Sequence, residues 1–145
     1  MLVKLLSIFE YDESGRICKE ACVEDPTWEQ IEASARRLDK FRFPFVWLFL
    51  SKGTTEERIP EFEIVGGNGD YCIACSISGY HERRYCDPTL GNEEIDLWTS
   101  DQGASAPAKH VLHDIAIVLE VAKYFCDEGD FCPSIPWEDP LPPRK

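Results

Sequence analysis

Two stretches of the chain carry apolar residues at the spacing of an amphipathic helix. In the first, residues 27–40, Thr27 and Gln30 have the spacing of a capping box. Its apolar positions recur every three or four residues, at Trp28, Ile31, Ala35 and Leu38. Because Pro44 follows, the pattern predicts one helix over residues 27–40.

The second helical stretch, residues 111–129, is longer. Asp114 is a suitable N-cap, and Gly129 suits the position just after the end of a helix. The apolar face consists of Ile115, Val118, Leu119, Ala122 and Phe125. We expect this face to pack on a sheet.

The pattern before and between these helices is typical of strands. Residues 2–9 and 16–23 flank turn formers, which predicts a hairpin within residues 1–25. Residues 45–50 form a continuous apolar run, which indicates a central strand buried on both faces. Residues 59–77 predict a hairpin around Asn68-Gly69, since Asn-Gly between two alternating segments is a strong turn signal.

The later part of the chain predicts less regular structure. Residues 83–86 and 94–98 indicate two short strands, and the small, polar residues 101–109 indicate an exposed loop. Residues 133–145 contain five prolines, which predicts an extended tail anchored by Trp137. The whole pattern predicts an α+β fold in a single domain, residues 1–145, with two helices packed on a mostly antiparallel sheet of about five to seven strands.

Charge narrows the choice of partner. The chain has 27 acidic and 15 basic residues, a formal net charge of −12. This charge would repel phosphate backbones, so direct nucleic-acid binding is disfavoured, whereas a basic protein partner would be attracted. The same excess of acid could also serve solubility alone.

Other features bear on where the protein acts. No apolar stretch approaches the roughly 20 residues that cross a bilayer, and the N-terminus lacks the pattern of an export signal. We therefore expect a cytoplasmic protein that does not bind membranes. In a reducing cytosol the seven cysteines are expected to be reduced and free of metal.

Several residues are candidates for sites of chemistry. Cys72 and Cys75 have zinc-knuckle spacing, but in a strand they would point to opposite faces. His110 and His113 could share a helix face, with Cys86 or Glu120 as a third group. No complete arrangement of nucleophile, base and oxyanion donor is recognisable, so we expect neither an enzyme nor a cofactor.

Three stretches, residues 62–71, 85–88 and 111–138, resemble immunity protein family 1 of bacterial polymorphic toxin systems. The most specific part is the closing helix followed by the Trp137-Glu138 ending. The resemblance implies a protein that neutralises a secreted toxin, commonly a nucleic-acid deaminase or nuclease, by direct binding. The matching positions are read as turn, core, helix stop and tail anchor, and they are Gly66, Gly67, Phe125, Gly129 and Trp137.

Recognition residues cannot be carried over from a family whose members bind different toxins, so they are predicted from charge and exposure. The predicted toxin-binding face comprises Asp87, Glu93, Glu94, Asp96, Trp98 and Asp101. Strict alternation in residues 94–98 would expose Trp98 with its acidic neighbours and turn Ile95 and Leu97 inward. We expect a monomer that forms a one-to-one complex with the toxin.

Two other classes of protein stay open. A generic acidic adaptor or peptide-binding module would have the same charge but no toxin gene beside it. A cysteine- or metal-dependent enzyme would retain zinc, or would lose activity on Cys86→Ser.

Overall fold

The computed structural model describes residues 1–53, 61–77, 81–99 and 103–139. In chain order the elements are β1 (Leu5–Tyr11), β2 (Ile17–Glu24), α1 (Trp28–Arg36), β3 (Phe45–Phe49), β4 (Phe62–Gly67), β5 (Asp70–Ile77), β6 (His81–Tyr85), β7 (Glu94–Trp98), β8 (Ala104–Pro107), a 3-10 turn η1 (Ala108–His110), α2 (Ile115–Glu128) and β9 (Trp137–Glu138).

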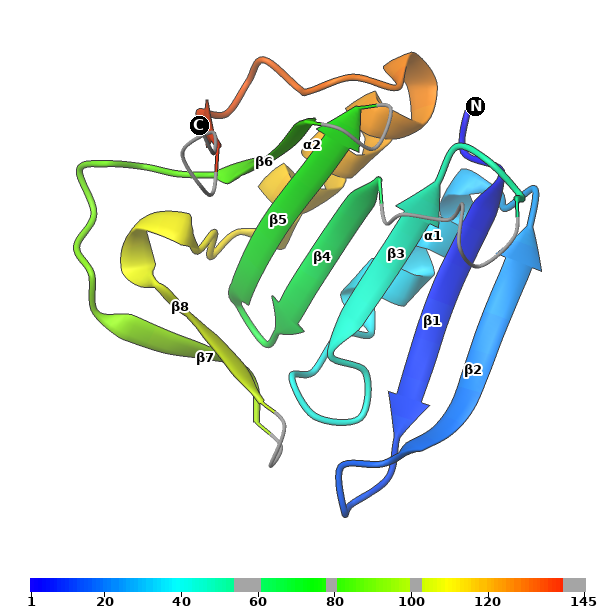
Figure 1. Ribbon diagram of the computed structural model, residues 1–145, viewed down its shortest axis with the longest axis horizontal. Helices are drawn as coiled ribbons and strands as arrows, with labels where there is room; N and C mark the ends of the chain where they lie inside the picture. Colours follow the sequence, from blue (N-terminus) through cyan, green and yellow to red (C-terminus); the bar gives the residue numbers. More distant parts are fainter. Residues whose placement is uncertain (54–60, 78–80, 100–102, 140–145) are drawn as a thin grey trace, which may run out of the picture.

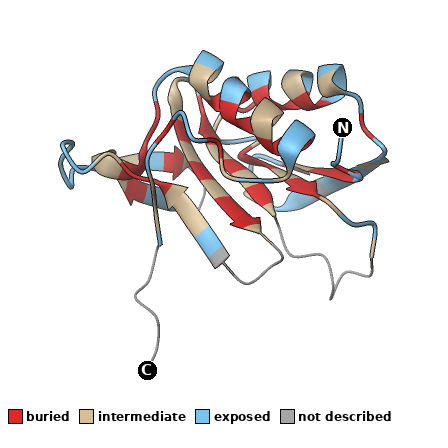
Figure 2. Cartoon of the chain, turned by 90° about the horizontal axis from the view of Figure 1, so that it is seen from above, coloured by how far each residue is buried: buried red, intermediate tan, exposed pale blue. Residues whose placement is uncertain are grey.

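The predicted α+β fold is confirmed. Seven strands form one sheet in the order β2-β1-β3-β4-β5-β6-β9, and each neighbouring pair is antiparallel. Both helices cover the same face of this sheet, and β7 and β8 form a separate two-stranded ribbon (Figure 1). The buried residues gather between the helices and the sheet (Figure 2). The core therefore lies on one side of the main sheet.

Helix α1 begins where its capping box predicts. The Thr27 hydroxyl accepts a hydrogen bond from the Gln30 backbone N–H at 3.2 Å, and the Gln30 side chain accepts one from the Thr27 N–H at 2.9 Å. The helix ends at Arg36, earlier than the predicted residue 40. The reason is the following loop, in which Lys40 has a φ of 69° and the Asp39 carboxylate accepts the N–H groups of Phe41 and Phe43.

Helix α2 starts later than predicted, because residues 111–113 are held outside it. Leu112 exchanges two backbone hydrogen bonds with Tyr71 on β5, at 2.7 and 2.8 Å. Asp114 then caps the helix by accepting the Ala116 N–H, and Gly129 ends it with a φ of 65°. Phe125 is fully buried and stacks on Phe62 of β4, with ring centroids 5.1 Å apart.

The turn between β4 and β5 requires its glycines. Gly66 and Gly67 have φ values of 131° and 140°. A Cβ on Gly66 would lie 2.0 Å from the Asp70 carbonyl oxygen, and one on Gly67 would lie 2.5 Å from the Asp39 backbone nitrogen. The predicted hairpin is present, and its turn is packed against the loop after α1.

Two expectations about the later chain have different outcomes. Residues 104–107 are predicted to lie in a loop but form β8. Strand pairing with β7 uses backbone hydrogen bonds, so it does not require an alternation of apolar and polar side chains. Trp137 does anchor the C-terminal segment: its indole N–H donates to the Cys132 carbonyl at 2.8 Å, and its backbone pairs with Tyr85. Residues 140–145 lie outside the described chain.

We predict that Phe125→Ala lowers the free energy of unfolding by about 3–5 kcal/mol, because it removes a fully buried ring from between α2 and β4. Denaturant titration measures this change. Glu120→Ala, at an exposed position of the same helix, is the control and should stay within about 0.5 kcal/mol of the parent. Equal effects of the two changes would contradict the packing described.

A second prediction concerns pH. Burial raises the pKa of Asp70, but hydrogen bonds with Lys40 at 2.5 Å and with His113 outweigh it, so the pKa is lowered overall. A depressed carboxyl pKa stabilises the fold above the unfolded value of about 3.9, and this stabilisation is lost as the pH falls through the lower folded value.

Asp70→Asn should therefore destabilise the protein by about 1 kcal/mol near neutral pH, and its difference from the parent should shrink below about pH 4. Thermal melts over a pH series test this. Asp127→Asn removes the partner of an exposed pair with Lys123 and should have a much smaller effect. A difference that grows on acidification would be inconsistent with the lowered pKa.

Candidate functional site

The β7–β8 ribbon carries three of the six predicted toxin-binding residues, Glu94, Asp96 and Trp98, and Glu93 directly precedes it. Glu93, Glu94 and Asp96 are exposed, and the Glu94 carboxylate accepts a hydrogen bond from Ser105 across the ribbon at 2.8 Å. The ribbon therefore presents acidic side chains to solvent. Asp101 lies outside the described residues.

Asp87 is placed differently from the ribbon acids. It is half-buried, and its carboxylate accepts hydrogen bonds from both the hydroxyl and the backbone N–H of Thr89. These hydrogen bonds lower the pKa of Asp87. The carboxylate is thus charged at neutral pH but is already used to hold the turn after β6.

The expectation of a freely exposed Trp98 is corrected. Trp98 is half-buried, and its ring lies 4.9 Å from Tyr11 and 5.9 Å from Phe45, centroid to centroid. The cause is an irregularity in the pairing of β7 with β8 between Asp96 and Trp98. Since a bulge interrupts the alternation of a strand, Leu97 and Trp98 can both pack inward while Asp96 points outward.

Trp98 belongs to a larger group of rings on the sheet face opposite α1 and α2, which we call the aromatic face. Phe45 and Trp47 stack at 4.9 Å, and ring contacts link them to the other members. The aromatic face consists of Phe9, Tyr11, Phe45, Trp47, Phe49 and Trp98. Over β1 and β3 no described helix covers it (Figure 1).

Sequence reasoning missed the aromatic face, although the signal was present. Residues 45, 47 and 49 are aromatic at alternate positions, whereas Val46 and Leu48 between them belong to the core under the helices. The apolar run of residues 45–50 predicts a strand with two buried faces, but this prediction does not distinguish one face from the other. Its alternation also separates an aliphatic face from an aromatic one.

A half-buried carboxylate lies on the same side of the sheet as the aromatic face. Glu63 on β4 pairs in register with Trp47 on β3. Burial, followed by the charge of Glu82, raises the pKa of Glu63. The Trp47 indole N–H opposes this shift, although it makes no well-formed hydrogen bond to a described residue.

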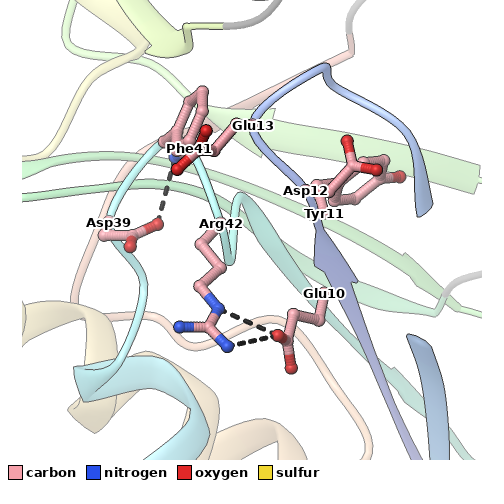
Figure 3. Close-up of a pocket in the computed structure, with 7 residues that line it drawn as sticks. All are labelled: Glu10, Tyr11, Asp12, Glu13, Asp39, Phe41 and Arg42. Atoms are coloured by element: carbon pink, nitrogen blue, oxygen red, sulfur yellow. Dashed lines mark hydrogen bonds and ion pairs between the residues drawn. The ribbon is translucent and has the colours of Figure 1, made fainter. Parts of the chain in front are cut away.

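Tyr11 lines a pocket of about 450 Å³ and also packs against Trp98. Figure 3 shows that two of its acidic side chains are engaged: Glu10 pairs with Arg42, whose Nε and Nη2 lie 2.9 and 2.5 Å from its Oε2, and Asp39 accepts the Phe41 N–H. The full lining is Glu10, Tyr11, Asp12, Glu13, Asp39, Phe41 and Arg42. The pocket extends the acidic surface beside the ribbon.

The structure separates Cys72 from Cys75, and His110 from His113. Cys75 lies in the core under the helices and Cys72 packs on the opposite side of the sheet, as strand geometry predicts. Burial raises their pKa values to about 12 and about 11. His113 is exposed and contacts Asp70 at 2.9 Å, away from His110.

His110 instead meets Cys86 and Glu138. His110 Nε2 lies 2.6 Å from Glu138 Oε1, and one potential ligand atom from each of the three residues lies within 4.8 Å of the others. The hydrogen bond with His110 lowers the pKa of Glu138. Burial, together with the Glu138 carboxylate, raises the pKa of the Cys86 thiol, which is the opposite of what a cysteine nucleophile needs.

Comparison with known proteins gives the fold a precedent. No protein-family model matches the chain, and no curated protein matches it. One solved structure, described as a hypothetical protein from Neisseria gonorrhoeae, superposes with a TM-score of 0.59 over 90% of this chain and 91% of that one, at 13% sequence identity. This likeness concerns the fold alone. No helix in the described part of the chain is long and apolar enough to cross a membrane.

We predict that Trp98→Ala lowers the free energy of unfolding by about 1–3 kcal/mol, because two ring contacts and part of a buried surface are lost. Thermal and denaturant unfolding measure the change. Leu90→Ala, at an exposed apolar position, should change stability by less than about 0.5 kcal/mol. A Trp98→Ala variant as stable as the parent would mean that the ring is not packed on Tyr11 and Phe45.

Proposed function

We propose that this protein is an immunity protein that binds a cognate bacterial toxin and neutralises it in the cytoplasm of the producing cell. The observation that carries the proposal is the exposed acidic ribbon, with Glu93, Glu94 and Asp96, beside the aromatic face. Acidic residues beside aromatic rings suit a basic protein partner, because the charges speed encounter while the partly exposed rings of Phe9, Trp47 and Trp98 supply contact area.

The distribution of charge supports this choice of surface. The formal net charge is −12, and the ribbon exposes Glu93, Glu94 and Asp96 close to Trp98. Asp12 and Glu13 line the pocket beside Tyr11, which packs on Trp98. A nucleic-acid deaminase or nuclease is itself basic where it holds phosphate. Such a toxin would meet a surface of complementary potential.

The packing of Trp98 changes its proposed role. A ring fixed against Tyr11 and Phe45 loses little conformational freedom on binding, so a half-exposed edge still contributes contact area. Trp98 is therefore proposed as a preformed part of the toxin interface. The acidic residues Glu93, Glu94 and Asp96 form its rim, and Asp87 stands at its border.

A binding role is favoured over catalysis by the chemistry of the one cysteine–histidine–carboxylate cluster found in the described residues. Its thiol is disfavoured as a nucleophile because its pKa is raised. The histidine is engaged by Glu138 through Nε2, so it is not directed at the thiol as a base. The resemblance to immunity family 1 points the same way.

We predict that charge reversal of Glu94 and Asp96 to Lys slows association with the toxin encoded beside this gene by about tenfold at low salt. The difference should narrow as salt is added, because screening removes long-range attraction. Stopped-flow or biosensor kinetics measure it, and inhibition of toxin activity on its nucleic-acid target is the functional readout.

The matched control is charge reversal of Glu29 and Glu120, two exposed acids on the helices that cover the other face of the sheet. It changes the net charge equally and should slow association much less. A parent protein that does not inhibit the toxin refutes the proposed function. Equal slowing by both pairs would retain the function but remove the ribbon as the interface.

A further inference from the structure

Three potential metal ligands converge from segments that are distant in the chain. Cys86 follows β6, His110 ends η1, and Glu138 is the last residue of β9. Their ligand atoms, a sulfur, an imidazole nitrogen and a carboxylate oxygen, all lie within 4.8 Å of one another. Only the tertiary fold brings them together, through the pairing of β9 with β6 and the backbone bond from Cys86 N to the Pro136 carbonyl.

The cluster has a buried floor and an open side. His110 is 2% exposed and Cys86 is 6% exposed. The Glu138 side chain is 40% exposed. Two donors are therefore held rigidly by their surroundings, while the third faces solvent, where an ion can arrive and where a water molecule can complete the coordination.

The orientation of the histidine is set from one side. Its Nε2 faces Glu138 Oε1 at 2.6 Å, whereas its buried Nδ1 has no hydrogen-bond partner among the described residues. The ring thus directs its Nε2 into the cluster. In the tautomer that carries its proton on Nδ1, Nε2 has a free lone pair with which it can bind a cation.

The donor set selects the kind of ion. Calcium and magnesium bind oxygen ligands, whereas a thiolate and an imidazole favour borderline-soft ions such as zinc. Zinc bound by three protein ligands commonly keeps a fourth position for water. We propose that Cys86, His110 and Glu138 bind one zinc ion, which fastens β9 to η1 and to the end of β6.

Binding requires changes at each ligand. The 2.6 Å hydrogen bond between His110 and Glu138 gives way, and His110 carries its proton on Nδ1, so that Nε2 and Glu138 Oε1 both offer lone pairs to the ion. The Cys86 thiol releases its proton to solvent, so that one thiolate, one carboxylate and Zn²⁺ sum to zero net charge. The Arg84 guanidinium, whose Nε is 3.8 Å from Glu138 Oε1, turns outward. Its side chain is 33% exposed, which leaves it room to do so.

This inference differs from the expectation of a metal-free protein, and it does not depend on the proposed function. The cysteine pair with zinc-knuckle spacing, Cys72 and Cys75, is separated by the strand. The predicted pair was His110 and His113 with Cys86 or Glu120 as a third group; the cluster keeps His110 and Cys86 and adds Glu138 from the C-terminal segment.

The test uses the full chain purified under reducing conditions, stripped with a chelator and titrated with zinc alone. We expect one zinc ion per chain by native mass spectrometry, and a higher melting temperature in its presence. Cys86→Ser and Glu138→Gln should each weaken zinc binding by more than about tenfold, measured by competition with a chromophoric chelator. Cobalt substitution should give a thiolate-to-metal absorption band that is absent from Cys86→Ser.

The controls are Cys132→Ser, at another buried cysteine, and Asp139→Asn, at the carboxylate next to Glu138. Both should bind zinc like the parent. A substitution of buried His110 could prevent folding, so the test relies on Cys86→Ser and Glu138→Gln, which change few atoms. Far-UV circular dichroism checks that both variants are folded. Absence of zinc binding by the parent, or equal binding by folded Cys86→Ser and the parent, would overturn the proposal.

Discussion

The close approach of the β4–β5 turn to the loop after α1 is the constraint on which the other parts of the structure depend. Gly67 lies so near Asp39 that a Cβ would collide with the backbone, and Lys40 bonds to the Gly66 carbonyl and to the Asp70 carboxylate. Thr99, just after β7, donates to the Lys40 carbonyl, and Leu112, before α2, pairs with Tyr71. The glycine turn therefore positions the first helix, the second helix and the ribbon at once.

This arrangement leaves the main sheet with two unlike faces. Under the helices the strands present aliphatic side chains such as Ile64 and Val46, together with Phe62. On the other face the ribbon covers Val65 and Cys72, and beyond it the rings of β1 and β3 pack on one another. The acidic ribbon stands beside these rings because Thr99 donates a hydrogen bond to Lys40, in the loop that is bonded to Gly66. The position of the proposed interface thus depends on the hydrogen bond that holds the end of the ribbon to the loop after α1.

The C-terminal segment is fastened by polar contacts as well as by packing. Trp137 donates to the Cys132 carbonyl and packs on Phe131, while Glu138 meets His110 and Arg84. Two adjacent residues therefore have different roles: Trp137 is an aromatic anchor, and Glu138 is the hydrogen-bond partner of a buried histidine. A zinc ion at the cluster would replace hydrogen bonds with coordination bonds at the same three residues and leave the backbone pairing of β9 unchanged.

The sequence alone determined the fold class, the capping box at Thr27 and Gln30, the stop at Gly129 and the hairpin around Asn68, because these depend on periodicity and on residues close together in the chain. It also separated Cys72 from Cys75, since alternation along a strand is local. Only the tertiary structure decided the packing of Trp98 on Tyr11 and the meeting of Cys86, His110 and Glu138. Each of these depends on strand register or on contacts between distant segments, and one extra residue in β7 was enough to turn Trp98 from solvent toward the sheet.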